Sequence, residues 1–444
     1  MMMNKILYAC LLTATCLLSA CSTQQMITKK ASRSLIHDPV LKQAHIGILI
    51  QDVDNSSTQY SYQSDKLFTP ASNVKIISCY AAMKYLSEKI PAAIITDLDT
   101  ALLITPTGDP TFLHPDFQKH PFFEQLRLIN KPLYIGQSNW STPALGPGWS
   151  WDDYNYHYMA ERSSFPIYGN LINWFQQKSK KENPTYSGDT TDLFVYSIPD
   201  VTWHVNFGKP GKKFNVVRDM HHNAFTIYEG EQSSASTSIP FITDGVETAI
   251  ALLRDSLHKE VIKANDDIIQ LSRGKKKDTI YSQPTDSVLK KMMYRSDNFY
   301  ADQSLAMVSQ LILQEINEPA IIEQLLSNDL TGISRSATWV DGSGLSRYNQ
   351  FSPSDMVVVL NKIRSEFPWE RISTIFPRVG NGNNSSTTGN IIYAKSGSMS
   401  GIYCLSGYVF SKKGKWLSFS IMINNHASTA AELRNRILGC LEAL

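Results

Sequence analysis

The sequence predicts an α/β (α+β) fold in which an antiparallel sheet is flanked by helices and interrupted by a large β-rich insertion. Alternating apolar runs bounded by turn residues lie near both ends of the chain. Helical patterns accompany these runs. About 220 residues separate two serine-containing motifs, which is more than a connection within one domain requires. We therefore expect the two chain ends to form one domain and the middle to form others.

Size and charge are consistent with a globular protein of two or three domains. The chain has 444 residues, of which 42% are hydrophobic, and this length exceeds that of one ordinary core. The 42 basic residues nearly balance the 40 acidic ones, which gives a net charge of +2. We expect no binding to nucleic acid, because the composition lacks the excess of basic residues that such binding requires.

The first residues predict an export signal. Lys5 precedes an apolar run over residues 6–18, which is too short to span a bilayer, so we assign residues 1–20 to a signal peptide. The stretch "LSAC" resembles the bacterial lipobox, which implies that Cys21 is lipidated and anchors the protein to a membrane facing the periplasm. Ser22 in place of aspartate favours the outer membrane of a Gram-negative cell. The alternative is an ordinary signal peptide cut after Ala20.

Three cysteines remain after this segment: Cys79, Cys404 and Cys440. They lie scattered on apolar elements and do not form the spacing pattern of a disulfide framework. We predict that they pack in the core.

The elements follow in order along the chain. Residues 45–63 read as two strands joined by a turn at Asp54 and Asn55. Residues 76–83 are apolar on nearly every side and predict a helix that is buried all round. Residues 403–410 and 415–425 read as strands, and residues 428–444 as a helix. We assign residues 21–89 and 281–444 to a catalytic domain and residues 90–280 to β-rich accessory structure, with Arg273–Lys277 as a solvated linker.

Ser72 and Lys75 form the first candidate catalytic pair. Pro70 places Ser72 near the first turn of the following helix, where free N–H groups and the helix dipole favour negative charge. Positions three apart share a helix face, and a buried amine that loses its charge can take the serine proton. The same spacing occurs without this setting at residues 256 and 259, 272 and 275, and 287 and 290. A capped helix with a snorkelling lysine is the structural alternative for Ser72 and Lys75.

Two later motifs favour the catalytic interpretation. Ser296-Asp297-Asn298 ends a helical run that begins near Thr285, and Lys395-Ser396-Gly397 follows β-forming residues on a predicted strand. In this order and context, the three elements are typical of active-site serine penicillin-recognising enzymes. They imply a penicillin-binding/β-lactamase-like transpeptidase domain.

These motifs suggest a distinct catalytic role for each of their residues. Ser72 attacks an acyl carbonyl and Lys75 acts as base, while the N–H groups of Ser72 and, by resemblance, Ser398 stabilise the oxyanion. The Ser296 hydroxyl can relay a proton to the leaving amine.

The remaining motif residues suit substrate binding. Lys395 adds positive charge, which favours the neutral form of the first lysine and attracts an anionic substrate. The Asn298 amide can hold the acyl side chain, and the Ser396 hydroxyl suits a terminal carboxylate. Gly397 leaves room for a substrate that lies along the strand edge. Asp297 shapes its loop in the simplest interpretation.

The chain resembles the low-molecular-mass class C penicillin-binding proteins, the D-alanyl-D-alanine carboxypeptidase/endopeptidase family. The stretches "PASNVK", "GDPTF", "GPGWSWDD", "SDNFYAD", "DGSGLSR" and "AKSGSMSG" match the pattern of this family in order. The resemblance implies cleavage of peptidoglycan stem peptides, covalent inhibition by β-lactam antibiotics, and extra domains inserted between the first two motifs.

The same resemblance implies a binding site for diaminopimelate. Asp153 and Tyr158 would bind its ammonium group, and Arg347 would bind its carboxylate. The structural alternative is that the aromatic residues of this region are packing anchors and that Arg347 pairs with Asp341.

Two other functions compete with the peptidase. A β-lactamase shares the serine chemistry, but the sequence has no E-x-x-L-N element to position a deacylating water, and the large insertion is foreign to compact β-lactamases. A non-catalytic cell-wall-binding lipoprotein would be expected to have lost the nucleophile. No cluster of metal ligands accompanies the motifs, so we expect no metal or cofactor.

Overall fold

The computed structural model describes residues 26–136, 139–180, 191–380 and 390–444, so the predicted signal peptide and Cys21 lie outside the described residues. The chain divides into two compact units. The first contains the chain up to Tyr80, Lys290–Ser296 and Gln324–Leu444. The second contains Ala81–Leu289 and also Asp297–Glu323, a segment that the sequence analysis assigned to the catalytic domain.

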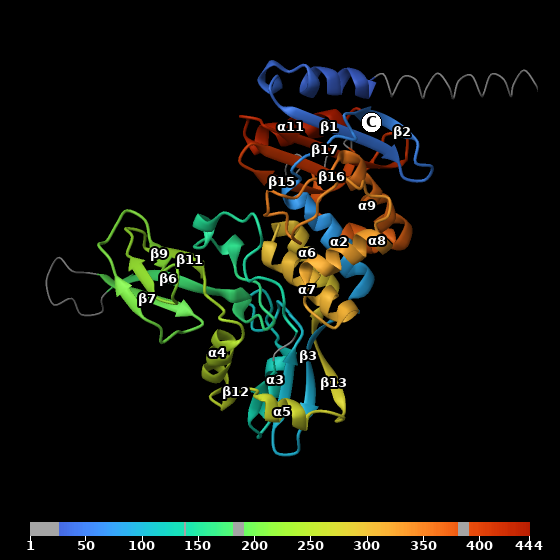
Figure 1. Cartoon of the computed structure of the whole chain (residues 1–444). Coiled ribbons are helices and arrows are strands. Elements are labelled where there is room, and N and C mark those ends of the chain that lie inside the picture. The colour runs from blue at the N-terminus through green and yellow to red at the C-terminus, as the bar shows by residue number, and fades with distance from the viewer. Residues whose placement is uncertain (1–25, 137–138, 181–190, 381–389) are drawn as a thin grey trace, which may run out of the picture. The chain divides into compact units, whose positions relative to one another are not determined.

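A six-stranded antiparallel sheet forms the centre of the first unit (Figure 1). Its strands, in spatial order, are β14 (Arg378–Val379), β15 (Ile391–Met399), β16 (Ile402–Phe410), β17 (Trp416–Asn424), β1 (His45–Asp52) and β2 (Thr58–Tyr62). The pairing of β1 with β17 joins the two ends of the chain in one sheet. The predicted fold class and the terminal strands are confirmed.

Helices cover both faces of this sheet. On one face, Ile48 and Ile421 lie in a buried cluster with Leu438 of α11 (Ala430–Leu441). On the other face, α9 (Pro353–Glu366) accepts a hydrogen bond at Leu360 O from the Tyr408 hydroxyl, at 2.6 Å. The sheet therefore serves as a rigid layer between two apolar interfaces.

Local sequence signals explain where these two helices begin. Ser352 and Asp355 exchange side-chain to backbone hydrogen bonds at the start of α9, with Pro353 at the first helical position. Thr429 and Glu432 form the same capping box at the start of α11. The predicted C-terminal helix is confirmed.

The three cysteines predicted for the core, Cys79, Cys404 and Cys440, are buried and form no disulfide. Several further helices belong wholly or partly to this unit. These helices are α2 (Lys75–Tyr85), α6 (Thr285–Arg295), α8 (Glu318–Asn328) and α10 (Trp369–Ile375). No helix among the described residues is both long enough and apolar enough to cross a membrane.

The second unit is β-rich, as predicted for the insertion. A five-stranded mixed sheet contains, in spatial order, β12 (Val261–Lys263), β5 (Leu133–Ile135), β4 (Leu102–Pro106), β3 (Lys89–Asp97) and β13 (Lys277–Pro284). The helices of this unit include α3 (Pro121–Leu128), α4 (Glu247–Leu257), α5 (Asp266–Leu271) and α7 (Asn298–Leu313).

Two three-stranded sheets complete the second unit. One contains β11 (Ser234–Pro240), β6 (Leu171–Lys180) and β7 (Thr191–Ile198), and the other contains β8 (Val205–Phe207), β10 (Phe225–Tyr228) and β9 (Asn215–Arg218). The two sheets share a core in which the Trp174 and Phe225 rings lie 5.3 Å apart between centroids. Each of these sheets thus has an inner face that faces the core.

Candidate active site

Ser72 lies in a strained turn at the start of a buried helix. The segment Ala71–Val74 is a 3-10 turn and α2 begins only at Lys75, so Ser72 precedes the α-helix and does not lie in its first α-turn. Ala71 has φ +48°, which is unfavourable for a residue with a side chain. The side chain of Ser72 nevertheless remains partly accessible. A strained backbone that presents an accessible hydroxyl is a common feature of nucleophile turns.

Lys75 is fully buried beneath this turn. Its Nζ donates a hydrogen bond to Ser72 Oγ at 3.0 Å and another to the Ser343 carbonyl oxygen at 2.6 Å. The lysine is therefore held against the serine and does not snorkel to solvent. This geometry rules out the surface-lysine interpretation of the pair.

The three other lysines at the same spacing make different contacts. Lys259 Nζ donates to carbonyl groups at the end of α3. Lys275 pairs with Asp99 at 2.7 Å, and Lys290 lies over the Tyr294 ring. These lysines therefore make local structural contacts, unlike Lys75.

Lys395 brings a second buried amine to the first unit. It lies on β15 and donates to Ser296 Oγ at 2.9 Å and to the Ser396 carbonyl oxygen at 2.7 Å. Burial, and then the positive charge of Lys75, hold the pKa of Lys395 well below its usual value. Ser296 itself has φ +60°, a second strained position in this group. Ser72 with Lys75 and Ser296 with Lys395 thus form two hydrogen-bonded pairs within the first unit, and the charge of one lysine acts on the other.

The other two residues of the S-D-N motif belong to the second unit. Asp297 caps α7 by accepting a hydrogen bond from the Tyr300 backbone N–H at 3.0 Å, so it does shape its loop. Asn298 is the first residue of α7, and its Nδ2 donates to the Tyr158 carbonyl oxygen at 2.9 Å. This contact joins two predicted substrate-binding residues that are far apart in the sequence.

Gly397 allows β15 to pass directly against the nucleophile turn. A Cβ atom at this position would lie 2.5 Å from the Pro70 carbonyl oxygen and 3.0 Å from the backbone nitrogen of Ser72. Only glycine fits this approach. The neighbouring Ser396 and Ser398 side chains are exposed, as a substrate-facing role requires.

One edge of β15 is open along the Lys395-Ser396-Gly397 motif. The short strand β14 pairs only with Tyr393 and Ile392 of β15. Beyond the hydrogen bond from Ala394 N to Pro377 O, no strand among the described residues pairs with this edge. An extended peptide could therefore add to the sheet here by backbone hydrogen bonds.

The segment Asp341–Arg347 makes contacts that the sequence analysis did not assign. It supplies the Ser343 carbonyl that binds Lys75, and Ser78 Oγ donates to the Gly342 carbonyl oxygen at 2.6 Å. Gly344 has φ +77°, and a Cβ atom there would collide with the Ala71 carbonyl. The stretch "DGSGLSR" indicated that this segment matters, but no residue pattern reveals a bond made by a backbone carbonyl.

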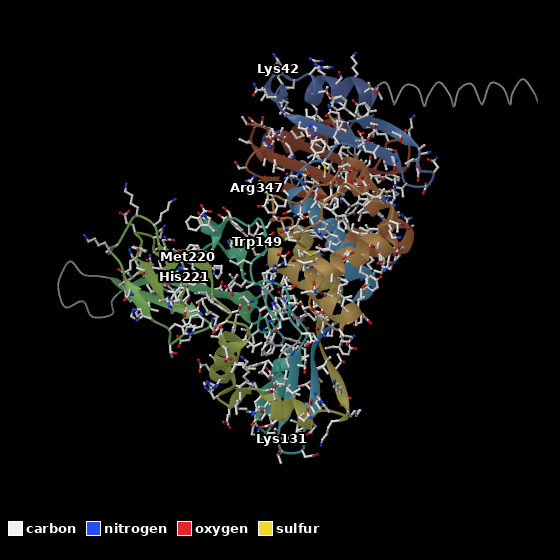
Figure 2. All side chains as sticks on the ribbon, in the orientation of Figure 1. Lys42, Lys131, Trp149, Met220, His221 and Arg347 are labelled. Atoms are coloured by element: carbon white, nitrogen blue, oxygen red, sulfur yellow. The ribbon has the colours of Figure 1, made fainter. Side chains whose placement is uncertain are left out.

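Arg347 and Asp341 do not pair. The buried Asp341 carboxylate accepts hydrogen bonds from the backbone N–H groups of Gly344, at 2.8 Å, and Ser346, at 2.7 Å. The Arg347 side chain is exposed (Figure 2) and forms no ion pair with another described residue. The structural alternative for Arg347 is therefore wrong, and its guanidinium is available to a ligand.

Asp153 and Tyr158 interact within the second unit. They lie on consecutive 3-10 turns, Trp151–Asp153 and His157–Met159. Burial, followed by a hydrogen bond with the Asp153 carboxylate, raises the pKa of Tyr158 to about 12. Trp151 is 69% exposed and is not a packing anchor. An acid beside a phenol and an exposed indole can bind a cationic group.

Comparisons with known proteins agree with the geometry. The family model described as D-Ala-D-Ala carboxypeptidase 3 (S13) family matches residues 28–443. The D-alanyl-D-alanine carboxypeptidase DacB of Haemophilus influenzae is 22% identical over 439 residues, which cover 88% of each chain. A D-alanyl-D-alanine carboxypeptidase of an Actinomadura species is 23% identical over 442 residues, covering 89% of this chain and 81% of that protein.

Solved structures share the fold. Penicillin binding protein 4 (dacB) from Haemophilus influenzae has a TM-score of 0.67 and 20% identity, covering 94% of this chain and 97% of its own. A predatory peptidoglycan endopeptidase from Bdellovibrio bacteriovorus has a TM-score of 0.51 and 12% identity, covering 89% and 92%. Because the family model spans nearly the whole chain, the protein belongs to the D-Ala-D-Ala carboxypeptidase 3 (S13) family of serine peptidases.

Proposed function

We propose that this serine DD-peptidase forms its acyl-enzyme on Ser72, with Lys75 as the base. The observation that carries the proposal is the buried Lys75 amine, whose Nζ lies 3.0 Å from Ser72 Oγ. In its neutral form the amine can accept the hydroxyl proton across this contact. Among the four serine–lysine pairs with this spacing, the contact supports the choice of Ser72 and Lys75.

The reaction then proceeds in two balanced steps. Ser72 Oγ bonds to the carbonyl carbon of the penultimate D-alanine, and its proton passes to Lys75. The C–N bond breaks, and the leaving amine takes a proton by way of Lys75 or the Ser296 hydroxyl. Water, deprotonated by the same base, hydrolyses the ester and restores Ser72. The backbone N–H groups of Ser72 and Ser398 stabilise the oxyanion in both steps.

Lys395 and Ser396 hold the anionic end of the substrate in this proposal. The peptide lies along the open edge of β15, where Gly397 leaves space for its backbone. The Ser396 hydroxyl and the nearby Lys395 amine suit a terminal carboxylate. Asn298 contributes its amide to the acyl side chain.

Penicillin labelling tests the nucleophile. We expect intact-mass analysis to show one penicilloyl adduct per chain, and peptide mapping to place it on Ser72. Ser72→Ala should give no adduct. An adduct on another residue, or an equal adduct on Ser72→Ala, would show that Ser72 is not the nucleophile. The complex of the related Haemophilus influenzae protein with a β-lactam makes this probe appropriate.

The substrate class follows from the family, and its finer recognition is our proposal. The enzyme acts on peptidoglycan stem peptides, which end in D-alanine or carry diaminopimelate cross-links. We assign the ammonium group of diaminopimelate to Asp153 and Tyr158, and its carboxylate to Arg347. The exposed guanidinium and the acid beside a phenol support these roles.

Arg347→Ala should reduce kcat/KM on diaminopimelate peptides by about ten- to a hundredfold, because one charge-assisted hydrogen-bonding group is lost. The second-order rate of penicillin acylation should change little, since penicillin lacks that side chain. Arg335→Ala, at another exposed arginine of the same unit, is the matched control. Equal slowing of peptide cleavage and penicillin acylation would indicate that Arg347 supports the scaffold and not substrate recognition.

The protein works as an exported enzyme, because its substrate lies outside the cytoplasmic membrane. We further propose that Cys21 is lipidated and that the anchor lies in the outer membrane if the source is Gram-negative. Mass spectrometry of membrane-extracted protein should find an acylated N-terminal Cys21. Recovery of a soluble mature form that begins with unmodified Cys21, or with another residue, would contradict this assignment.

A further inference from the structure

The outer face of the β11-β6-β7 sheet carries an exposed row of apolar side chains. Phe194, Tyr196 and Ile198 alternate along β7 and are 53%, 46% and 48% exposed. The pairing register places Phe175 of β6 opposite Tyr196, and their rings stack at 5.1 Å with an interplanar angle of 16°. We call this surface the aromatic face.

The pattern is not a consequence of incomplete packing. The intervening residues of the same strands point to the opposite side, where Trp174 is buried in the core of the unit and Gln176 bonds to the Gly230 backbone. Alternation along a strand thus separates a filled inner side from an outer side that no described segment covers. Exposed aromatic residues gathered on one sheet face are unusual for a surface without a ligand.

In its central part, the aromatic face carries neutral polar residues. Between Asn173 and Gln177 the register places three residues from each strand on this side, and none of them is charged. β11 contributes serines at positions 234, 236 and 238, and Ser238 Oγ donates to Asn173 Oδ1 at 2.6 Å. The surface therefore combines aromatic rings with amide and hydroxyl groups.

This chemistry discriminates among possible occupants. A membrane surface would require Lys or Arg beside the aromatic residues, and this face has neither. A peptide that adds to a sheet binds an edge and not a face. A neutral polysaccharide fits, because the C–H faces of sugar rings pack on aromatic rings while sugar hydroxyl and acetamido groups bond to serine, asparagine and glutamine.

We propose that the aromatic face binds the glycan strand of peptidoglycan. The inference rests on the proposed function, since the stem peptides that the enzyme cleaves are attached to that strand. The glycan is largely uncharged where it bears peptides, because the lactyl carboxylate of each substituted muramic acid is consumed in the amide bond to the peptide. The face thus complements the strand in charge and in hydrogen-bonding groups, and binding there raises the local concentration of stem peptides around the enzyme.

The experiment measures capture of the full mature protein by bead-coupled glycan strands that an amidase has freed of peptides. The lactyl carboxylates that the amidase releases are first capped as methyl amides, so that the strands stay as uncharged as they are where they bear peptides. Tyr196→Ala should weaken capture by about five- to tenfold, because it removes one ring from the stacking surface. Tyr196→Phe should bind like the wild type. The matched control is Tyr281→Ala, because Tyr281 of β13 is 45% exposed against 46% for Tyr196 but lies in the five-stranded sheet.

A second readout separates binding from folding and catalysis. Tyr196→Ala should retain the wild-type kcat/KM on a short soluble stem peptide and lose rate on intact sacculi. Equal capture of Tyr196→Ala and the wild type would overturn the proposal, and so would capture only by beads that carry peptides or by anionic lipid vesicles. Ser72→Ala should still bind glycan, so failure of the penicillin test and failure of glycan capture are distinguishable.

Discussion

Lys75→Ala should slow acylation by penicillin at least about a thousandfold, since general-base catalysis and activation of the nucleophile are lost together. The Ser72 hydroxyl would remain in place but would have no group at 3.0 Å to receive its proton. The measurement is the second-order rate constant of acylation by penicillin, and Ser72→Ala serves as the inactive control. A thermal melt checks that the variant remains folded despite the loss of the bond to the Ser343 carbonyl.

Two further variants sharpen this prediction. Lys75→Arg keeps a positive charge and hydrogen-bond donors, but a guanidinium does not release its proton, so it should be about as slow as Lys75→Ala. Lys290→Ala removes a lysine that has the same spacing from a serine but lies over Tyr294, and it should acylate like the wild type. Rapid acylation of Lys75→Arg would assign Lys75 an electrostatic role and would exclude it as the base.

Gly397→Ala should lower penicillin acylation and peptide cleavage together by about a hundredfold or more, because the oxyanion donors and the nucleophile lose their alignment. The added Cβ atom would lie 2.5 Å from the Pro70 carbonyl oxygen and 3.0 Å from the Ser72 nitrogen, so either β15 or the nucleophile turn must move. Backbone atoms cannot rotate away as a flexible side chain can. We expect a loss of stability of about 1–3 kcal/mol as well.

The control for this substitution is Gly439→Ala. Gly439 lies in α11, and a Cβ atom there would meet nothing within 4 Å. That variant should keep full activity and gain slightly in stability, because alanine favours the helix more than glycine does. If Gly397→Ala acylated at the wild-type rate, the strand and the turn would have room to separate, and Gly397 would not be needed for the close approach.

The sequence was most informative where chemistry and local pattern coincide. Ser72, Lys75, Ser296 and Lys395 could be chosen because each residue type has a role at its spacing, and the structure places Lys75 against Ser72 and Lys395 against Ser296. The terminal strands and helix were readable from alternation and capping. These signals are local, so one sequence suffices to find them.

Other features depend on contacts between distant segments and left no local trace. The Ser343 carbonyl binds Lys75 through a backbone atom, which any residue type would supply. The positive φ of Ala71 arises in a residue that normally avoids it, so composition argues against the conformation that is observed. The aromatic face can be recognised only from the pairing register of β6 and β7, because exposed and buried aromatic residues look alike in sequence.

The open edge of β15 carries a risk of self-association. A row of unpaired backbone groups that accepts a substrate strand can equally accept a strand from another copy of the chain, which is how edge-to-edge polymers begin. β15 limits this hazard by its side chains. The exposed positions of the motif, 396 and 398, hold serines and not the β-branched or aromatic residues that favour strand stacking. The hydroxyl groups of this strand therefore have a second effect, because they make the exposed edge a poorer template for a strand from another copy of the chain.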